Sequence, residues 1–238
     1  MNIIADLHTH NGEVCGHADT TLDGIITRAV ALKHCAVAIT DHSPLVENTP
    51  VSYYLDNLKL KDKYKDITLL CGIEEDITDK SGKLYMDTAD LLKLDWVIAS
   101  FHCYSNESGM IESNTAGYLA ALENPALDCL GHIDRNGHNA DYEKVIQAVL
   151  EKGKTVEINE LSFYGDHIGH EIAMLCKKYK LPIVLSSDSH TENNIGVFTR
   201  SINMLMELDF PKELVINADK DRLFDFINKR RIEKNKYI

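Results

Sequence analysis

Short apolar runs alternate along this chain with longer segments in which apolar residues recur every three or four positions. The short runs are almost continuously apolar and rich in Val, Ile and Leu, which is typical of parallel strands that are buried on both faces. We predict seven such strands, over residues 2–8, 35–40, 67–73, 95–101, 127–133, 155–159 and 182–187.

The segments between the strands include clear amphipathic helices. Three of them cover residues 139–153, 166–179 and 219–231. Asn139 or Asp141 can cap the first helix, and Gly153 can end it. Asp219 can cap the last helix. Strand and helix alternate about seven times, which predicts parallel βα units that are either closed into a barrel or open as a doubly wound sheet.

No linker rich in Gly, Ser or Pro and no low-complexity run interrupts this alternation, so we predict one domain over residues 1–238. Residues 78–88 are expected to form a local hairpin or loop after the third strand. The hydrophobic content of 44% is enough for a buried core.

The charge of the chain limits its partners. A net charge of −12 argues against binding to nucleic acid or to an anionic membrane, because Lys and Arg do not cluster. Bound divalent cations would reverse the sign of the charge around a site, so anionic substrates remain compatible with the sequence. We find no secretion signal and no apolar run of membrane-spanning length, and we therefore expect a cytoplasmic protein.

The six cysteines are scattered, without a Cys-x-x-Cys pair. Four of them lie in apolar stretches and are expected to be small buried hydrophobes, namely Cys35, Cys71, Cys129 and Cys176. Cys15 and Cys103 lie beside histidines, where soft metal ligands are the alternative to packing. The neighbouring imidazoles are better placed by their spacing, so we favour packing for both.

Histidines and acids recur at one end of the predicted strands. Each strand is followed at its carboxyl end by candidate metal ligands: His8, His10 and His17; Asp41 and His42; Glu74 and Glu75; His102; His132 and Asp134; Glu157 and Asn159; Asp188 and His190. The carboxyl ends of parallel strands in a barrel gather around one mouth, where such folds keep their chemistry. Residues placed for packing alone would not recur at that one position.

These candidates offer imidazole nitrogens and carboxylate oxygens, a mixture that suits zinc and also manganese or iron. A carboxylate such as Glu74 can bridge two ions, and nine good candidates imply two or three ions. Several ions together activate water and bind phosphoryl oxygens, so hydrolysis of a phosphate ester is the expected class of reaction.

The motifs "DLHTH", "ITDH", "GIE", "FH", "GH", "EIN" and "SDSH" occur in this order, and "GVFTRSINMLMELDFPKELVIN" follows them. In these motifs the chain resembles the PHP (polymerase and histidinol phosphatase) superfamily over essentially its whole length, most closely the small stand-alone phosphatases of the YcdX type. The resemblance implies a distorted seven-stranded (β/α)7 barrel, similar to a TIM barrel, with a trinuclear metal centre, usually zinc, at the carboxyl ends of the strands.

The resemblance also implies a ligand set and a mechanism. The first ion would be held by His8, His10, Glu74 and Asp188, the second by Glu74, His102 and His132, and the third by His17, His42 and His190. A hydroxide held between two ions would attack phosphorus. Asp6, Asp41 or Asn159 would orient ligand imidazoles through hydrogen bonds.

Arg135 lies in the sequence "IDRNGH", where relatives of this type more often have proline after the histidine. Near the mouth, its forked guanidinium would bind a phosphate. The alternative is a surface arginine paired with a nearby acid. We assign the direct catalytic roles to Glu74, Asp188 and Arg135.

Other polar residues carry simpler expectations. Glu75 points opposite to Glu74 in an extended segment and is expected to be solvated or at the edge of the core. Four histidines are expected to be structural or on the surface, with substrate contact as the alternative for the second and third of them: His34, His138, His167 and His170.

Together these features predict a metal-dependent phosphatase that hydrolyses a small phosphate monoester with three divalent ions. Three alternatives remain: a nucleotide phosphatase or exonuclease that acts on terminal phosphates, a histidinol-phosphate phosphatase, and a zinc-binding protein without enzymatic activity. The expected partner is a small phosphorylated substrate, without membrane or nucleic acid, and the sequence leaves homo-oligomers open.

Overall fold

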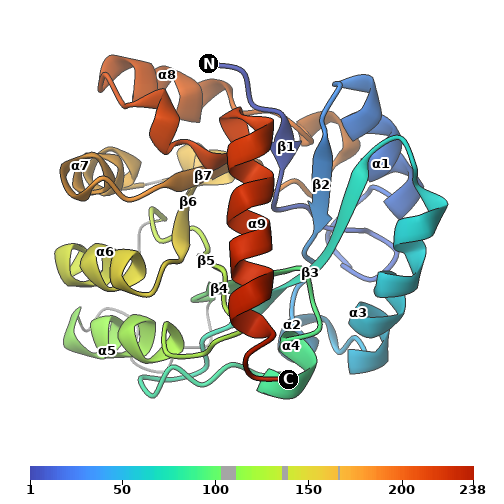
Figure 1. The fold of residues 1–238 in the computed structure, drawn as a ribbon, viewed down its shortest axis with the longest axis horizontal. Helices are drawn as coiled ribbons and strands as arrows, with labels where there is room; N and C mark the ends of the chain where they lie inside the picture. The colour runs from blue at the N-terminus through green and yellow to red at the C-terminus, as the bar shows by residue number, and fades with distance from the viewer. Residues whose placement is uncertain (103–110, 136–138, 166) are drawn as a thin grey trace.

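The computed structural model describes residues 1–102, 111–135, 139–165 and 167–238. Seven strands form one sheet, in which each strand pairs in parallel with the next one along the chain (Figure 1). The strands are β1 (Ala5–Asp6), β2 (Ala36–Ile39), β3 (Thr68–Asp76), β4 (Trp96–Ser100), β5 (Cys129–Leu130), β6 (Thr155–Asn159) and β7 (Ile183–Ser186).

The sheet curls until its first and last strands are neighbours. Just beyond β1 and β7, Thr9 and Ser189 form a parallel bridge. At the other end, the Asn217 side chain donates to the carbonyls of Ala5 and Leu185 and accepts from the Leu185 amide. The strands therefore form a nearly closed, distorted (β/α)7 barrel similar to a TIM barrel, which confirms the barrel alternative over the open sheet.

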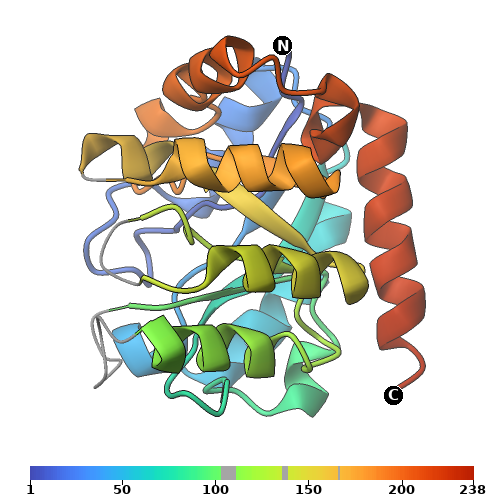
Figure 2. The same cartoon turned by 90° about the vertical axis from the view of Figure 1, so that its left-hand side faces the viewer.

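Helices connect the strands and surround them (Figure 2). The α-helices in the described ranges are α1 (Leu22–Ala31), α2 (Pro44–Glu47), α3 (Val51–Asn57), α4 (Thr88–Leu91), α5 (Ile111–Ala121), α6 (Tyr142–Glu151), α7 (Gly169–Tyr179), α8 (Thr199–Glu207) and α9 (Lys220–Lys234). Short 3₁₀ helices are η1 (Leu58–Lys63), η2 (Glu160–Tyr164), η3 (Glu192–Asn194), η4 (Lys212–Leu214) and η5 (Ile216–Ala218). None of the helices in these ranges is long and apolar enough to cross a membrane.

Alternate residues of a strand face the inside of the barrel and the surrounding helices. In β2, Ala36 and Ala38 belong to the inner apolar cluster, whereas Val37 and Ile39 pack with residues of α1. Trp96 of β4, the one tryptophan in the sequence, fills the inner cluster and is 1% exposed. The near-continuous apolar strands of the sequence are explained by this burial on both faces.

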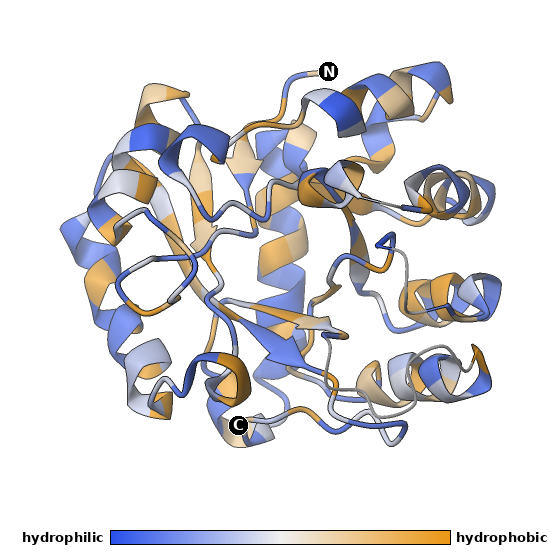
Figure 3. Ribbon diagram, turned by 180° about the vertical axis from the view of Figure 1, so that it is seen from behind, coloured by the Kyte–Doolittle hydropathy of each residue, from blue (hydrophilic) through white to orange (hydrophobic). Residues whose placement is uncertain are grey.

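Helix α9 closes the amino end of the barrel, and Figure 1 shows it lying across the strands. Leu223 and Ile227 of α9 join the inner apolar cluster. Arg230 and Lys234 form buried ion pairs with Asp128, with N–O distances of 3.0 and 2.5 Å. The loops that follow the strands lie on the opposite side, as Figure 2 and Figure 3 show, so the carboxyl end remains open for a site.

All seven predicted strands are present, but some of their bounds differ. β1 and β5 have two residues each, because only these residues find parallel ladder partners on the neighbouring strands. β3 continues beyond the predicted end at residue 73 to Asp76, since it pairs with β4 over five positions. The carboxyl ends of β1 and β5 therefore leave the ladder early and approach the mouth as loops.

The predicted helix ends and turn are confirmed. Asp141 caps α6 by accepting from the Lys144 amide, and Gly153 follows the helix with a positive φ of 63°. Asp219 caps α9 by accepting from a backbone amide of the first turn. Residues 78–88 begin with a short hairpin, in which Ile77 bridges Leu84 in antiparallel fashion.

Candidate metal centre

Glu74 lies at the centre of a group of histidines. Its side chain is fully buried, and its Oε1 lies 2.8 Å from His132 Nε2 and 3.4 Å from His102 Nε2. Its Oε2 lies 2.8 Å from His42 Nδ1 and 3.4 Å from His8 Nε2. One carboxylate of β3 thus contacts imidazoles that follow four other strands, as expected for residues at one barrel mouth.

Asp188 provides the second acidic contact of the group. Its Oδ1 lies 3.1 Å from His10 Nε2 and 3.6 Å from His8 Nε2, and its Oδ2 accepts from Arg135 Nη2 over 2.7 Å. Asp188 has a φ of +52°, in the left-handed region that residues other than glycine rarely adopt. The backbone after β7 therefore takes a strained conformation at the point where it delivers this carboxylate.

Two further expected ligands lie at the rim of the mouth. The His190 ring stacks on those of His10 and His17, with centroid distances of 4.2 and 4.6 Å. His17 Nε2 lies 3.3 Å from His42 Nε2, and 55% of the His17 side chain is exposed. The structure thus brings all nine residues of the expected ligand set to one place, and Arg135 with them.

Several buried polar atoms of this group lack hydrogen bonds. Within the described part of the chain, His10 Nδ1 and His190 Nε2 are unpaired atoms at the mouth, and His8 Nε2 and His42 Nδ1 approach Glu74 Oε2 to 3.4 and 2.8 Å without forming hydrogen bonds. Each unpaired buried polar atom costs about 1–3 kcal/mol. Ligand atoms of His8, His10 and Asp188 lie within 4.8 Å of one another, as do those of His42, Glu74 and His102. Divalent cations among these donors would satisfy them, so the residues fit a metal centre.

The charges of the group keep both acids ionised. Burial opposes ionisation of Glu74, but His102, His8 and His42 together hold its pKa well below the usual range. Burial likewise opposes ionisation of Asp188, and the neighbouring His8 contributes most to holding its pKa well below the usual range. Both side chains are therefore carboxylates at neutral pH and available as ligands.

Two acids that the sequence analysis did not single out as supports hold ligand imidazoles. Glu157 Oε2 lies 3.0 Å from His8 Nδ1, and Glu157 Oε1 accepts from the His132 amide over 2.6 Å. Asp76 Oδ1 lies 2.7 Å from His102 Nδ1. Such contacts fix the orientation and tautomer of a ligand ring. Asp76 is the last residue of β3 and Glu157 lies near the end of β6, which was the available signal, but their partners cannot be found from the sequence.

The expected supports make other contacts. Asp6 accepts from backbone amides of the segment after β7, and Asp41 accepts from a backbone amide after β1 and from the Tyr53 hydroxyl. Asn159 donates to Glu157. Among the described residues, these side chains hold loops and the acids Glu157 and Asp188 instead of imidazoles.

Glu75 is buried rather than solvated. Its carboxylate accepts from the backbone amides of Tyr85 and Met86 over 2.8 and 3.2 Å, and burial raises its pKa to about 8. These contacts tie β3 to the hairpin that follows it. They are consistent with the expectation that Glu75 points away from Glu74.

The other described histidines are not part of the group, although the backbone of His167 pairs with that of Arg135 in an antiparallel bridge. His34 is buried, His167 is half-buried and His170 is exposed, in keeping with structural or surface roles. His138 and Cys103 lie outside the described residues.

The cysteines fall into two kinds. The four that were expected as hydrophobes pack in apolar clusters, namely Cys35, Cys71, Cys129 and Cys176. Cys15 is also buried, but its Sγ lies 3.5 Å from His17 Nδ1 and 3.6 Å from Glu47 Oε1. Burial, together with carboxylates that include Glu47, raises the pKa of the Cys15 thiol to about 12. Cys15 is therefore a buried thiol whose sulfur lies beside polar side chains.

A cavity of about 490 Å³ opens over the histidines. Its polar lining includes His17, His42, His102, His132, Arg135, Asp188 and His190. Val46 and Leu161 provide apolar wall. One third of the Arg135 side chain is exposed, at 33%. The volume suits a small molecule that reaches the imidazoles and the guanidinium together.

The barrel and the imidazole and carboxylate group at its mouth define a class of barrel proteins with a multinuclear candidate metal site. The chain belongs to the PHP domain family, whose sequence profile matches residues 6–161.

Curated relatives match almost the whole chain. A protein of Clostridium botulinum (strain Okra / Type B1), named a probable phosphatase, is 35% identical over 235 residues, which are 97% of this chain and 96% of the relative. A probable phosphatase of Clostridium acetobutylicum is 34% identical over 241 residues, covering 99% and 98% of the two chains. These relatives confirm the expected class of enzyme, a hydrolase of phosphoric esters.

Solved structures share the fold. Histidinol phosphate phosphatase of Lactococcus lactis, in complex with zinc, L-histidinol and phosphate, has a TM-score of 0.60 at 16% identity, covering 89% of this chain and 95% of that one. A chain of archaeal ribonuclease P with mature tRNA has a TM-score of 0.59 at 13% identity, covering 98% and 92%. Because these two proteins differ so much from each other, structural similarity at such low sequence identity defines the fold alone.

Proposed function

We propose that this protein is a metal-dependent phosphatase that hydrolyses a small phosphate monoester at three divalent ions, with zinc expected and manganese or iron as alternatives. One observation carries the proposal: donors from six strand ends, those of β1 to β5 and β7, converge around Glu74 and Asp188, and several of them are buried without hydrogen bonds. In a protein core that binds no ligand, buried polar atoms are normally hydrogen-bonded.

We assign the ligands as the resemblance implies. His8, His10, Glu74 and Asp188 hold the first ion, Glu74, His102 and His132 the second, and His17, His42 and His190 the third. When bound, such ions activate a water molecule as the nucleophile and neutralise charge on the phosphoryl oxygens. Glu157 and Asp76 keep the His8 and His102 rings in orientation for ligation.

Arg135 binds the phosphate in this proposal. Its guanidinium lines the cavity beside Asp188 and keeps donors beyond the one that Asp188 accepts. A planar fork suits two oxygens of a phosphate. The apolar walls at Val46 and Leu161 exclude part of the water and contact the organic part of the ester.

The volume of the cavity favours a small ester over a polymer. The Lactococcus lactis neighbour of the same fold is complexed with zinc, L-histidinol and phosphate, and ligands of that size support the proposal of a small ester. The net charge of −12 disfavours nucleic acid as a partner. We further propose one domain over residues 1–238 and a cytoplasmic location.

The test combines metal content with turnover. Purified protein should contain about three divalent ions per chain and should hydrolyse p-nitrophenyl phosphate or a member of a phosphorylated metabolite panel. Glu74→Gln should lose both bound metal and activity, because the amide lacks the charge that bridges two ions. Glu123→Gln, on the surface, is the matched control and should keep both.

The outcomes separate the alternatives. Fully metallated protein without activity on any phosphate ester would support the zinc-binding protein and contradict the enzyme. Activity without bound metal, or unchanged metal content in Glu74→Gln, would contradict the assigned centre.

A further inference from the structure

We propose that Cys15 supplies a thiolate ligand to the ion at the rim of the mouth, together with His17 and His42, and that this ligand gives the rim position a preference for zinc over manganese. The inference rests on the proposed metal centre, but its test can fail while that centre stands.

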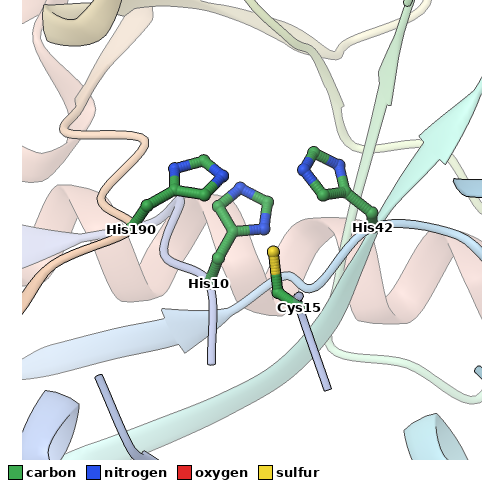
Figure 4. A group of neighbouring side chains, drawn as sticks. All are labelled: His10, Cys15, His42 and His190. Atoms are coloured by element: carbon green, nitrogen blue, oxygen red, sulfur yellow. The ribbon is translucent and has the colours of Figure 1, made fainter. Parts of the chain in front are cut away.

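The loop after β1 fixes Cys15 in place. The amides of Val14 and Cys15 donate to the Asn11 carbonyl over 3.1 and 2.9 Å, and the Ala18 amide donates to the Cys15 carbonyl. Cys15 is fully buried. Figure 4 shows its thiol pointing into the space between His10 and His42. The backbone thus holds the sulfur at the histidines without any help from an ion.

Two sets of candidate ligand atoms share this sulfur. In each set, all atoms lie within 4.8 Å of one another: His10, Cys15, His42 and His190 in the first, and Cys15, His17, His42 and Glu47 in the second. Four donors at such separations are what a tetrahedral zinc site needs. The sulfur therefore lies where it can coordinate an ion at the rim.

A second observation points to a ligand in the same place. His10 Nδ1 and His190 Nε2 are buried and make no hydrogen bond within the described residues. The Cys15 thiol is a weak donor that at most one neighbour can accept. An ion at the rim would satisfy imidazole nitrogens and sulfur together, which a thiol cannot do.

Glu47 holds the loop on the outer side of the sulfur. Its Oε2 accepts from the Gly16 amide over 3.1 Å, and its Oε1 lies 3.1 Å from His17 Nδ1. This contact orients the exposed His17 ring toward the mouth, so Glu47 acts as a positioning residue for the rim site.

The chemistry of binding is a simple exchange. The S–H bond of Cys15 breaks, a sulfur–metal bond forms, and the proton leaves to solvent. The charge of the ion lowers the pKa of a coordinating thiol, so no other base is needed. Thiolate is a soft ligand that suits zinc and cobalt, whereas manganese prefers oxygen donors.

The decisive test uses cobalt in place of zinc. Protein loaded with Co²⁺ should show a sulfur-to-cobalt charge-transfer absorption in the near ultraviolet, and Cys15→Ser should lose it while keeping the visible cobalt bands. Cys35→Ser and Cys176→Ser, which change cysteines packed in apolar clusters, are matched controls and should retain the charge-transfer absorption. The visible bands report that each variant still folds and binds cobalt.

X-ray absorption of the zinc-loaded natural protein gives a second reading that needs no variant. It should require a zinc–sulfur distance of about 2.3 Å. In competition, Cys15→Ser should bind less zinc relative to manganese than the natural protein does.

Each failure has a distinct meaning. Visible cobalt bands without the charge-transfer absorption, or zinc without a sulfur neighbour, would overturn the thiolate and leave the proposed phosphatase intact. A charge-transfer absorption that survives in Cys15→Ser would also overturn it. Failure to bind any cobalt or zinc would overturn the metal centre itself.

Discussion

Asp76 lies outside the proposed ligand set but contacts one of its histidines. It holds His102 Nδ1 at 2.7 Å and accepts from the Ser43 hydroxyl over 2.6 Å. Asp76→Asn removes the charge from this contact, so we expect zinc affinity to fall about 10–100-fold. Competition with a chelator of known affinity measures the change.

The matched control for this variant is Asp79→Asn. Asp79 is an acid of the following turn whose carboxylate accepts from the amide and the hydroxyl of Ser81. Its substitution should leave zinc affinity unchanged. Equal affinity in both variants would show that Asp76 does not support the His102 ring.

Arg135 carries the second prediction at the scale of the residue. Arg135→Ala removes a charge-assisted hydrogen bond to substrate phosphate, worth about 1.5–3 kcal/mol, so kcat/KM should fall about 10–150-fold. Arg135→Lys keeps the charge but not the fork and should recover only part of the loss. If Arg135 serves only to neutralise Asp188, metal affinity will change and KM will not.

At the scale of the element, helix α9 stabilises the barrel from its amino end. Leu223 is fully buried against the inner cluster. Leu223→Ala should lower the free energy of unfolding by about 2–5 kcal/mol, since it removes apolar contacts and leaves a cavity. Urea unfolding measures the difference. Ile232→Ala on the same helix, where the side chain is 63% exposed, should change it by less than about 0.5 kcal/mol.

The turn between α6 and β6 carries a buried amine. Lys154 Nζ donates to the carbonyls of Leu122 and Asn124 over 2.5 and 2.6 Å, and burial together with Arg230 lowers its pKa to about 7. The folded state therefore binds fewer protons than the unfolded state between about pH 7 and 10.5. Lys154 should make the free energy of unfolding rise with pH in this window, by up to about 1.4 kcal/mol per pH unit.

Lys154→Met should remove this rise, because the side chain no longer titrates. Lys152→Met, which changes an exposed neighbour, should leave the slope as it is in the natural protein. Urea unfolding at a series of pH values compares the three proteins. A slope in Lys154→Met equal to that of the natural protein would contradict the role of the buried amine.

The strand ends explain how far sequence reasoning reaches. Ligands could be placed because the carboxyl ends of parallel strands share one mouth, whatever the exact strand bounds are. The partner of His8 could not be predicted. Glu157 lies 149 residues away in the sequence and contacts His8 only because the sheet curls and brings β1, β6 and β7 together. Cys15 was expected to pack, since a sequence gives no measure of how close a loop sulfur comes to the histidines.

At the scale of the whole molecule, one sheet runs through all seven strands and α9 packs back onto it. We expect residues 1–238 to unfold in one cooperative transition. Fluorescence of Trp96 reports the inside of the barrel, and far-ultraviolet circular dichroism reports the outer helices. Metal-free protein should give coincident transitions by both signals, whereas separate midpoints would show that the chain contains two units.

The barrel is not fully closed between β1 and β7, the first and last strands of the sheet. The contacts that join β1 to β7 there include the Thr9–Ser189 bridge, the Asp6 carboxylate, which accepts from the Ser187 amide, and the Asn217 side chain. In the proposed ligand set, His8 and His10 follow β1, whereas Asp188 follows β7. An ion bound by residues from both strands would connect β1 to β7, so metal binding would also stabilise the closed barrel.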